Sequence, residues 1–377
     1  MAPPIYSTGD PFLDFFFTLF NGIAEVPLFS SPVTGILILA GVILASRKAG
    51  AMMALSGMIG AGMAIAFGAP YDLVTFGLFG YNSILTGMAF WSGPFVKVNK
   101  ATFFISVFGA AVTAVTWMAF AHWMGDLFIL DGIAESWAIP GFTSSFCFTT
   151  WAMMYASKRY GHDIWPQPQM DPLAPAREEL ISGSGNPVQV KMENFKWTAK
   201  EFMIATLKGV SQVTFIGNWK TGIFWVVGLT LAFELAPLLP DQDRPWFTNG
   251  YTTQWDPFSP LYLAGLMALL GSGIGVTLAI LTKLPTAEIR LGLHGFNQVL
   301  VMIALTSFIP LTISSFFMAV LATAACSLIV MPALQRFFGM WGLPALTGPF
   351  VFTAWVWLLG VGGGFENIPA GIGWSRP

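Results

Sequence analysis

Runs of apolar residues recur along almost the whole chain, and this pattern limits what the chain can fold into more than any other feature. A helix of about 20 apolar residues is long enough to cross a lipid bilayer. The composition agrees, since only 10% of the residues are charged. In an ordinary soluble domain, roughly 25% of the residues are charged. Because the runs are continuous and do not alternate with a period of two, a β-barrel is not favoured. The sequence predicts an all-α polytopic membrane protein.

The apolar runs fall into two sets of five, separated by a polar stretch. A shorter segment that glycine interrupts precedes each set, at 11–29 and at 200–216. The expected spans are 33–46, 51–67, 80–96, 101–123 and 139–157, then 219–236, 260–282, 293–310, 311–333 and 343–360. The expected domains are a first repeat (1–158), a polar linker (159–199) and a second repeat (200–377) with an extra loop (239–260).

The two sets share three stretches that occur in the same order in both. FGLFGYNSILTGMA (76–89) returns as LGLHGFNQVLVMIA (291–304). The other two matches pair NGIAEVPLFSSPVTGI (21–36) with KGVSQVTFIGNWKTGI (208–223), and IPGFTSSFCFTTW (139–151) with LPALTGPFVFTAW (343–355). Three ordered matches indicate an internal duplication.

Five crossings are an odd number, so the second repeat would enter the membrane upside down. Inverted repeats of this kind place the functional site where the two halves meet, near the middle of the bilayer. The two short opening segments are then expected to be re-entrant half-helices. Non-helical backbone is tolerated at that depth only where protein or a water-filled cavity covers it. We therefore expect a central pore bordered by both half-helices.

Glu25 and Gln212 occupy equivalent positions in the two half-helices. A carboxylate inside a bilayer costs about 2.5–3.5 kcal/mol even on the mildest scale, so it needs a partner, a proton or a cavity. Either Glu25 lines a polar pore, or its half-helix ends near the interface and the side chain lies in water. Thr143 and Thr347 form a second equivalent pair. A hydroxyl in a membrane helix commonly bonds to its own backbone, but a threonine in both repeats favours a pore position.

An aromatic residue and an asparagine follow a glycine in both repeats, with a leucine one helical turn later. Residues four apart lie on the same helix face. Taken singly such residues are core packing, whereas a duplicated set around a common axis would form two apolar constrictions. The residues are Tyr81, Asn82 and Leu85 in the first repeat, and Phe296, Asn297 and Leu300 in the second.

The sequence gives no support to enzymatic chemistry. Cys147 and Cys326 lie inside apolar spans and predict neither a disulfide nor a metal or cofactor site. No phosphate loop, nucleophile motif or metal-ligand spacing is present. The net charge of −2 argues against nucleic acid as a partner. Polar oxygens flanked by apolar slots suit a small, planar, neutral solute better than an ion, because neither a ring of charges nor a carbonyl filter is visible.

These residues resemble the urea transporters, a family with bacterial and animal members. The resemblance covers essentially the whole chain and is closest to the bacterial type. The most specific stretch is LPALTGPF (343–350), and the pairs GIAEV/GVSQV and GYN/GFN add to it. The resemblance implies a homotrimer in the cell membrane, surrounded by lipid. Each protomer would have its own pore and conduct urea passively down its gradient.

The resemblance also implies a role for each duplicated residue. Backbone carbonyls of the half-helices would form a ladder of acceptors for the N–H groups of urea. The implied pore residues are Glu25 and Gln212 beside Val26 and Val213; Leu28, Tyr81 and Leu85 at one slot; Phe215, Phe296 and Leu300 at the other; and Thr143 and Thr347 near the narrow centre. Asn82 and Asn297 are also expected to line the pore.

Two other functions stay open from the residues. One is a channel for another small amide or for ammonia, although the histidine pair of the ammonia channels is not visible. The other is an ion-coupled secondary transporter in which Glu25 carries the proton. A strong dependence of uptake on pH or sodium would favour the second.

Overall fold

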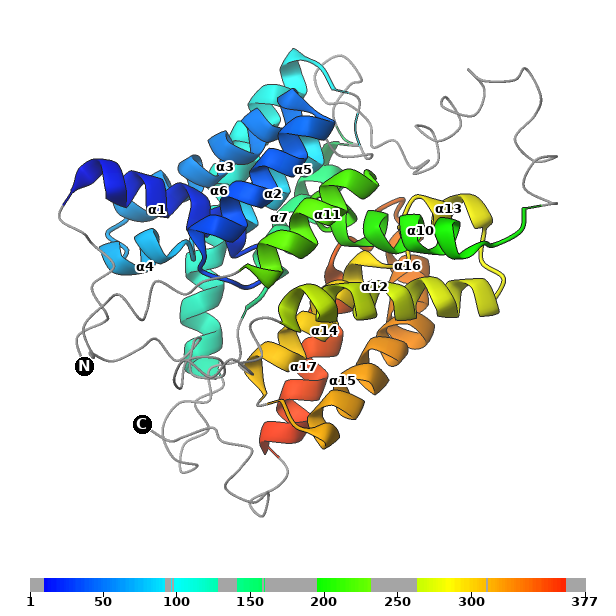
Figure 1. Ribbon diagram of the computed structural model, residues 1–377. Helices are drawn as coiled ribbons and strands as arrows, with labels where there is room; N and C mark the ends of the chain where they lie inside the picture. The colour runs from blue at the N-terminus through cyan, green and yellow to red at the C-terminus, as the bar shows by residue number, and fades with distance from the viewer. Residues whose placement is uncertain are drawn as a thin grey trace.

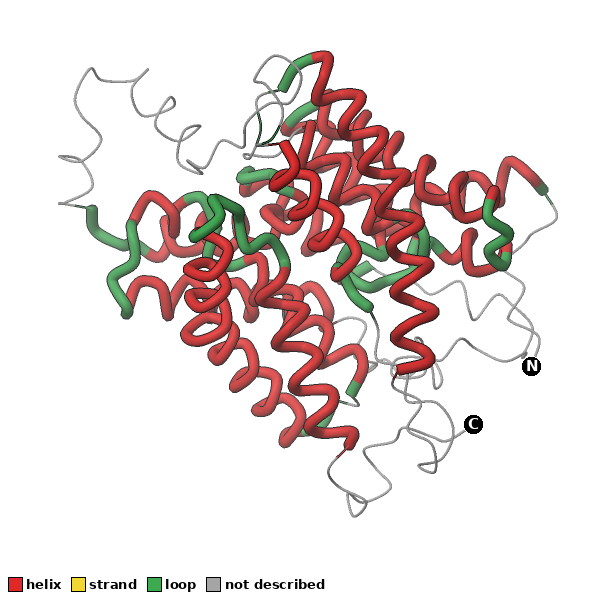
Figure 2. The backbone as a smooth tube through the Cα atoms, turned by 180° about the vertical axis from the view of Figure 1, so that it is seen from behind, coloured by secondary structure: helices red, strands yellow, loops and turns green. Residues whose placement is uncertain are grey.

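The computed structural model describes residues 10–91, 96, 98–127, 141–157, 159, 195–231, 263–309 and 311–363. Helices joined by short loops make up nearly all of this part of the chain (Figure 2). The all-helical fold expected from the apolar runs is therefore confirmed. Most of the polar linker and the extra loop at 239–260 lie outside the described residues.

The helices of the two repeats follow each other in the same order. The first repeat contains α1 (Pro11–Ala24), α2 (Pro32–Ala45), α3 (Arg47–Ala66), α4 (Tyr71–Phe76), α5 (Tyr81–Trp91), α6 (Lys100–Leu127) and α7 (Ser144–Ser157). The second contains α10 (Ala199–Ser211), the 3₁₀ turn η1 (Gln212–Thr214), α11 (Trp219–Thr230), α12 (Ala264–Leu281), α13 (Thr286–Arg290), α14 (Phe296–Phe308), α15 (Ile313–Ala325), η4 (Cys326–Val330), α16 (Met331–Gly339) and α17 (Gly348–Gly363).

Local sequence signals explain where the opening helices begin. Asp10 caps α1 by accepting hydrogen bonds from the backbone N–H groups of Phe12 and Leu13, at 2.8 and 3.3 Å. Pro11 follows it at the first helical position, where a missing N–H costs nothing. Ser31 and Pro32 start α2 in the same way, and Thr198 caps α10.

Both half-helices end in a tight reversal of the backbone. Leu28 and Phe215, at equivalent positions, have positive φ angles of 71° and 61°. The left-handed region is uncommon for residues with a side chain, so its presence in both copies marks a constrained turn. These turns end α1 and α10 after 14 and 13 residues. Both are shorter than the roughly 20 residues that cross a bilayer, but α2 and α14 have the same lengths, so that α1 and α10 are re-entrant half-helices stays a prediction.

The two repeats contact each other reciprocally at a seam between α2 and α11. The Thr34 hydroxyl donates to the Gly228 carbonyl oxygen at 2.8 Å, and the Thr221 hydroxyl donates to the Gly41 carbonyl oxygen at 2.8 Å. Because Thr34 corresponds to Thr221 and Gly41 to Gly228, the same contact is made in both directions. Reciprocity of this kind is the mark of a two-fold relation. Figure 1 shows α11, in green, beside α2, in blue, between the two sets of helices.

Within the described residues, four helices are long and apolar enough to cross a membrane: Arg47–Ala66, Lys100–Phe120, Ala264–Leu281 and Ile313–Gly339. Large apolar side chains cover the outer faces of these helices, such as Phe104 on α6 and Phe317 on α15, which are 68% and 65% exposed. A soluble protein rarely exposes so much apolar surface, whereas lipid tails would cover it in a bilayer. The number of crossings per repeat stays a prediction.

The second copy of the longest helix is not regular. Where α6 runs unbroken from Lys100 to Leu127, the corresponding helix is interrupted by the π-helical turn η4. The helix also continues to Gly339, six residues beyond the expected span at 311–333. The short helices α4 and α13 were not expected either. Each leads into a glycine with positive φ, Gly77 at 106° and Gly292 at 82°.

Candidate functional site

The hydroxyls of Thr143 and Thr347 meet at the centre of the molecule. Their Oγ1 atoms are 2.6 Å apart, and both residues are fully buried. Each threonine directly precedes a helix, α7 or α17. Since the two residues are equivalent, their contact joins the same position of both repeats. The Cys147 thiol lies 3.3 Å from the Thr347 hydroxyl and completes the cluster.

Asn82 and Asn297 hold the loops that carry these threonines. The Asn82 amide donates to the Phe142 carbonyl oxygen at 3.0 Å, and its Oδ1 accepts from the Phe146 backbone N–H at 3.1 Å. Phe142, the residue before Thr143, has a positive φ of 47°. One side chain therefore caps the start of α7 and fixes the strained residue before it.

The second repeat reproduces this clamp. The Asn297 amide donates to the Leu346 carbonyl oxygen at 3.2 Å, and its Oδ1 accepts from the Phe350 backbone N–H at 3.0 Å. Leu346 has a φ of 53°. The duplicated asparagine thus serves the backbone of the central loops, and its amide nitrogen and Oδ1 each have a backbone partner in both copies.

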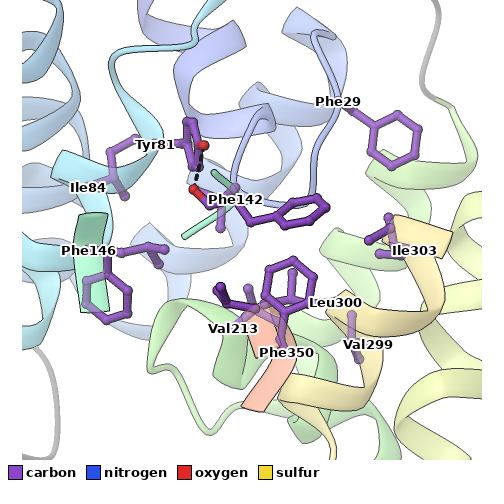
Figure 3. Packing of buried hydrophobic residues seen from close by; sticks show 14 of the residues in the cluster. Phe29, Tyr81, Ile84, Phe142, Phe146, Val213, Val299, Leu300, Ile303 and Phe350 are labelled. Carbon is purple, nitrogen blue, oxygen red and sulfur yellow. Dashed lines mark hydrogen bonds between the residues drawn. The ribbon is translucent and has the colours of Figure 1, made fainter. Parts of the chain in front are cut away.

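Tyr81 adds one bond that the second repeat lacks. Its hydroxyl donates to the Phe142 carbonyl oxygen at 2.7 Å, so this oxygen accepts from both Tyr81 and Asn82 (Figure 3). The equivalent residue in the second repeat, Phe296, has no hydroxyl. The Tyr81 ring also packs edge-on against Trp117, with ring centroids 5.6 Å apart. Tyr81 is thereby held in place from two sides.

The ends of the half-helices differ in how their polar side chains are bonded. The Gln212 amide donates to the Leu291 carbonyl oxygen at 2.9 Å, within its own repeat. Glu25 is 94% buried, and its carboxylate forms no hydrogen bond or ion pair within the described part of the chain. Val26 and Val213, the next residues, are fully buried.

The predicted residues all belong to one buried apolar cluster or to polar positions in its midst. Leu28 and Phe296 are partly buried against this cluster, and the other twelve are at least 92% buried. Figure 3 shows side chains of both repeats meeting there, with the Phe142 ring beside Leu300 and Phe350 and Tyr81 directed at the Phe142 carbonyl oxygen. The predicted residues are Glu25, Val26, Leu28, Tyr81, Asn82, Leu85, Thr143, Gln212, Val213, Phe215, Phe296, Asn297, Leu300 and Thr347.

Sequence reasoning missed several phenylalanines at the centre. Phe142 and Phe350 pack at 5.1 Å between ring centroids across the two repeats, and Phe146 lies 5.9 Å from Phe215. The duplicated matches IPGFTSSF and LPALTGPF contain a phenylalanine three residues after each threonine, and this signal could have identified Phe146 and Phe350. Among the described residues, no three His, Cys, Asp or Glu side chains are grouped closely enough to hold a metal ion.

Comparison with known proteins places the chain in a family. A family model described as urea transporter matches residues 2–130, 127–239 and 258–370. Urea transporter 1 of Capra hircus is 25% identical over 359 residues, which span 92% of this chain and 77% of the relative. Urea transporter 1 of Rattus norvegicus is 26% identical over 364 residues, with the same shares of the two chains.

The matched ranges cover far more than half of the chain and include parts of both repeats. The resemblance seen in the sequence is thus confirmed. The chain belongs to the urea transporter family, a family of membrane transport proteins and not of enzymes.

Proposed function

We propose that this protein conducts urea passively across the cell membrane through a narrow pore near its two-fold axis. The observation that carries the proposal is the meeting of Thr143 and Thr347, whose hydroxyls are 2.6 Å apart at the centre. A hydroxyl both donates and accepts hydrogen bonds. A pair of them at the narrowest point suits urea, which has N–H donors and a carbonyl acceptor.

The half-helix ends supply the acceptors of the proposed ladder. The last carbonyl groups of a helix have no partner inside it. In the turn after α1, hydrogen bonds use the carbonyl oxygens of Ile23, Ala24 and Glu25, and none of these turn bonds uses that of Val26. Losing hydrogen bonds to water costs urea about 1–3 kcal/mol for each unpaired group, so a row of acceptors lowers the barrier.

Flat apolar slots on either side of the centre would admit a planar solute and exclude a hydrated ion. Leu28, Tyr81 and Leu85 would form one slot, and Phe215, Phe296 and Leu300 the other. Because urea is neutral, the membrane potential does no work on it. Binding has to be weak at each step for conduction to be fast.

The proposal extends to the arrangement in the membrane. Five crossings and one half-helix per repeat would make the repeats inverted, with boundaries at 1–158 and 200–377 joined by the linker at 159–199. The apolar outer helices would contact lipid, and three protomers would assemble with one pore each. The apolar outer surface of α6 and α15 supports burial in a membrane.

Stopped-flow light scattering on proteoliposomes under an inward urea gradient tests the function. We expect fast urea entry that is independent of pH and sodium, and strongly slowed entry in Thr347→Val. Thr353→Val is the matched control, since the Thr353 hydroxyl bonds to the Pro349 carbonyl of its own helix at 2.7 Å. Entry no faster than in empty liposomes would refute urea as the permeant, and acetamide, methylurea and ammonia would be tested next.

Coupled transport is the second candidate, and the buried, unpaired Glu25 favours it. Uptake that requires a proton or sodium gradient would establish coupling. In that case Glu25→Gln would abolish the dependence on the gradient.

A further inference from the structure

The two ends of the proposed pore differ in chemistry, although they are built from equivalent half-helices. Asn21 lies in the last turn of α1 and Glu25 caps its C-terminal end, and the same positions of the second repeat carry Lys208 and Gln212. Residues four apart lie one turn apart on the same helix face. One end therefore combines a carboxylate with an amide, and the other a cationic amine with an amide.

Two acceptors at the C-terminal end of α1 lack a donor. The Asn21 amide nitrogen donates to the Thr75 carbonyl oxygen at 2.9 Å, but its Oδ1 is buried and has no partner among the described residues. Asn21 itself is 98% buried. The Glu25 carboxylate, one turn further, forms no bond within the described part of the chain either. Unpaired buried acceptors are costly, so this arrangement points to a missing donor.

The nearby hydroxyls cannot supply that donor. Tyr81 is close enough to Glu25 for the two to interact electrostatically, but its hydroxyl proton is bonded to the Phe142 carbonyl oxygen at 2.7 Å. Ser30 donates to the Phe76 carbonyl oxygen at 2.9 Å. In the second repeat, the equivalent carbonyl oxygen, that of Leu291, accepts from the Gln212 amide. Ser30 thus makes at Phe76 the bond that Gln212 makes at Leu291, and its hydroxyl proton is not available to the Glu25 carboxylate.

We propose that Asn21 and Glu25 form a binding site for a planar cation of urea's size and shape, namely guanidinium. Guanidinium has N–H donors on every edge and no acceptor, and it pairs with a carboxylate through two parallel hydrogen bonds. The carbonyl end of α1 adds partial negative charge at the same place. The proposal rests on the proposed pore, because a cation held there would block the path of urea.

Binding and block are measured separately, so that this inference and the proposed function can fail independently. Isothermal titration calorimetry of the purified protein with guanidinium chloride, below denaturing concentrations, detects the site without any flux. Urea entry into proteoliposomes with and without guanidinium chloride detects the block, with sodium chloride matching the ionic strength. We expect binding to the wild type and a matching inhibition of urea entry.

Glu25→Gln should weaken guanidinium binding about tenfold or more, because the charged partner is lost. Glu201→Gln is the matched control, since Glu201 pairs with Arg290 at 3.5 Å in the second repeat, and its affinity for guanidinium should equal that of the wild type. The double variant Glu25→Gln, Gln212→Glu keeps one pore carboxylate beside Lys208 and should stay weak.

Three results would overturn the inference. The first is that the wild type does not bind guanidinium, and the second is that Glu25→Gln binds it as tightly as the wild type. The third is that ammonium binds as tightly as guanidinium, which would show that the site does not recognise a planar shape. Urea entry that persists in any of these cases would leave the pore itself supported. Guanidinium binding without urea entry would instead establish the site and refute the proposed permeant.

Discussion

The two asparagine clamps should not be equally important for stability, although they are built alike. Asn297→Leu removes the only bonds that the described residues provide for two buried backbone groups, the Leu346 carbonyl and the Phe350 N–H. Asn82→Leu leaves just the Phe146 N–H unpaired, because the Phe142 carbonyl keeps the Tyr81 hydroxyl. Each buried group without a partner costs about 1–3 kcal/mol. The substitution in the second repeat should therefore cost about 1–3 kcal/mol more.

The assay is equilibrium unfolding in mixed micelles, with helicity followed by circular dichroism as the denaturing detergent increases. Tyr81→Phe in the Asn82→Leu background supplies the internal check. It removes the remaining bond to the Phe142 carbonyl, and the cost of the double variant should rise to that of Asn297→Leu. Equal unfolding free energies for the two single variants, or a larger loss at Asn82, would refute this account of the clamps.

Two further predictions concern packing. Thr34→Val and Thr221→Val should each lower the free energy of unfolding by about 1 kcal/mol, because each removes one hydrogen bond of the seam between α2 and α11. Unfolding in mixed micelles measures both losses, and unequal losses would argue against a two-fold relation of the repeats. Gly35→Ala should prevent folding, since its new methyl group would overlap the Phe20 carbonyl oxygen. Gly62→Ala, with nothing within 4 Å of the added atom, should be tolerated, as the yield of monodisperse protein in size-exclusion chromatography would show.

The sequence was sufficient to predict the duplication and the places of most helices, because both depend on residues close together in the chain. The pattern of apolar runs marks helices, and the repeated stretches align them. Glu25 and Gln212 fell at the ends of α1 and α10 for the same reason. Equivalent positions were thus predictable without knowledge of any long-range contact.

The hydrogen bonds that the asparagines make to the central loops could not be predicted in this way. Asn82 was interpreted as a pore residue, yet its partners lie 60 and 64 residues away in the chain. Periodicity indicates which face of a helix a residue occupies, but not which carbonyl oxygen or N–H group it meets there. The positive φ of Phe142 and Leu346, which creates the need for a clamp, leaves no mark in the sequence, since neither residue is glycine.

The π-helical turn escaped prediction for a related reason. In the first repeat the Ser83 hydroxyl donates to the Ala110 carbonyl oxygen in the middle of α6. The equivalent residue of the second repeat is the larger Gln298, whose amide donates to the Ser327 hydroxyl inside η4. A longer side chain at this contact needs more room, and an extra residue in the helical turn provides it. The apolar pattern alone does not distinguish the two helices, but Pro332, which follows η4 and has no N–H to donate, is a sequence signal for the irregular turn that α6 lacks.

The threonine pair at the centre also determines when the site comes into existence. Thr143 and Thr347 are separated by 204 residues, and Thr347 directly precedes α17, the last described helix. A growing chain completes its N-terminal parts first. During synthesis, Thr143 therefore has no partner until almost the entire second repeat is made. A ribosome that stops before α17 releases a chain in which Thr143 has no partner, so the contact between the two threonines forms only once α17 is made.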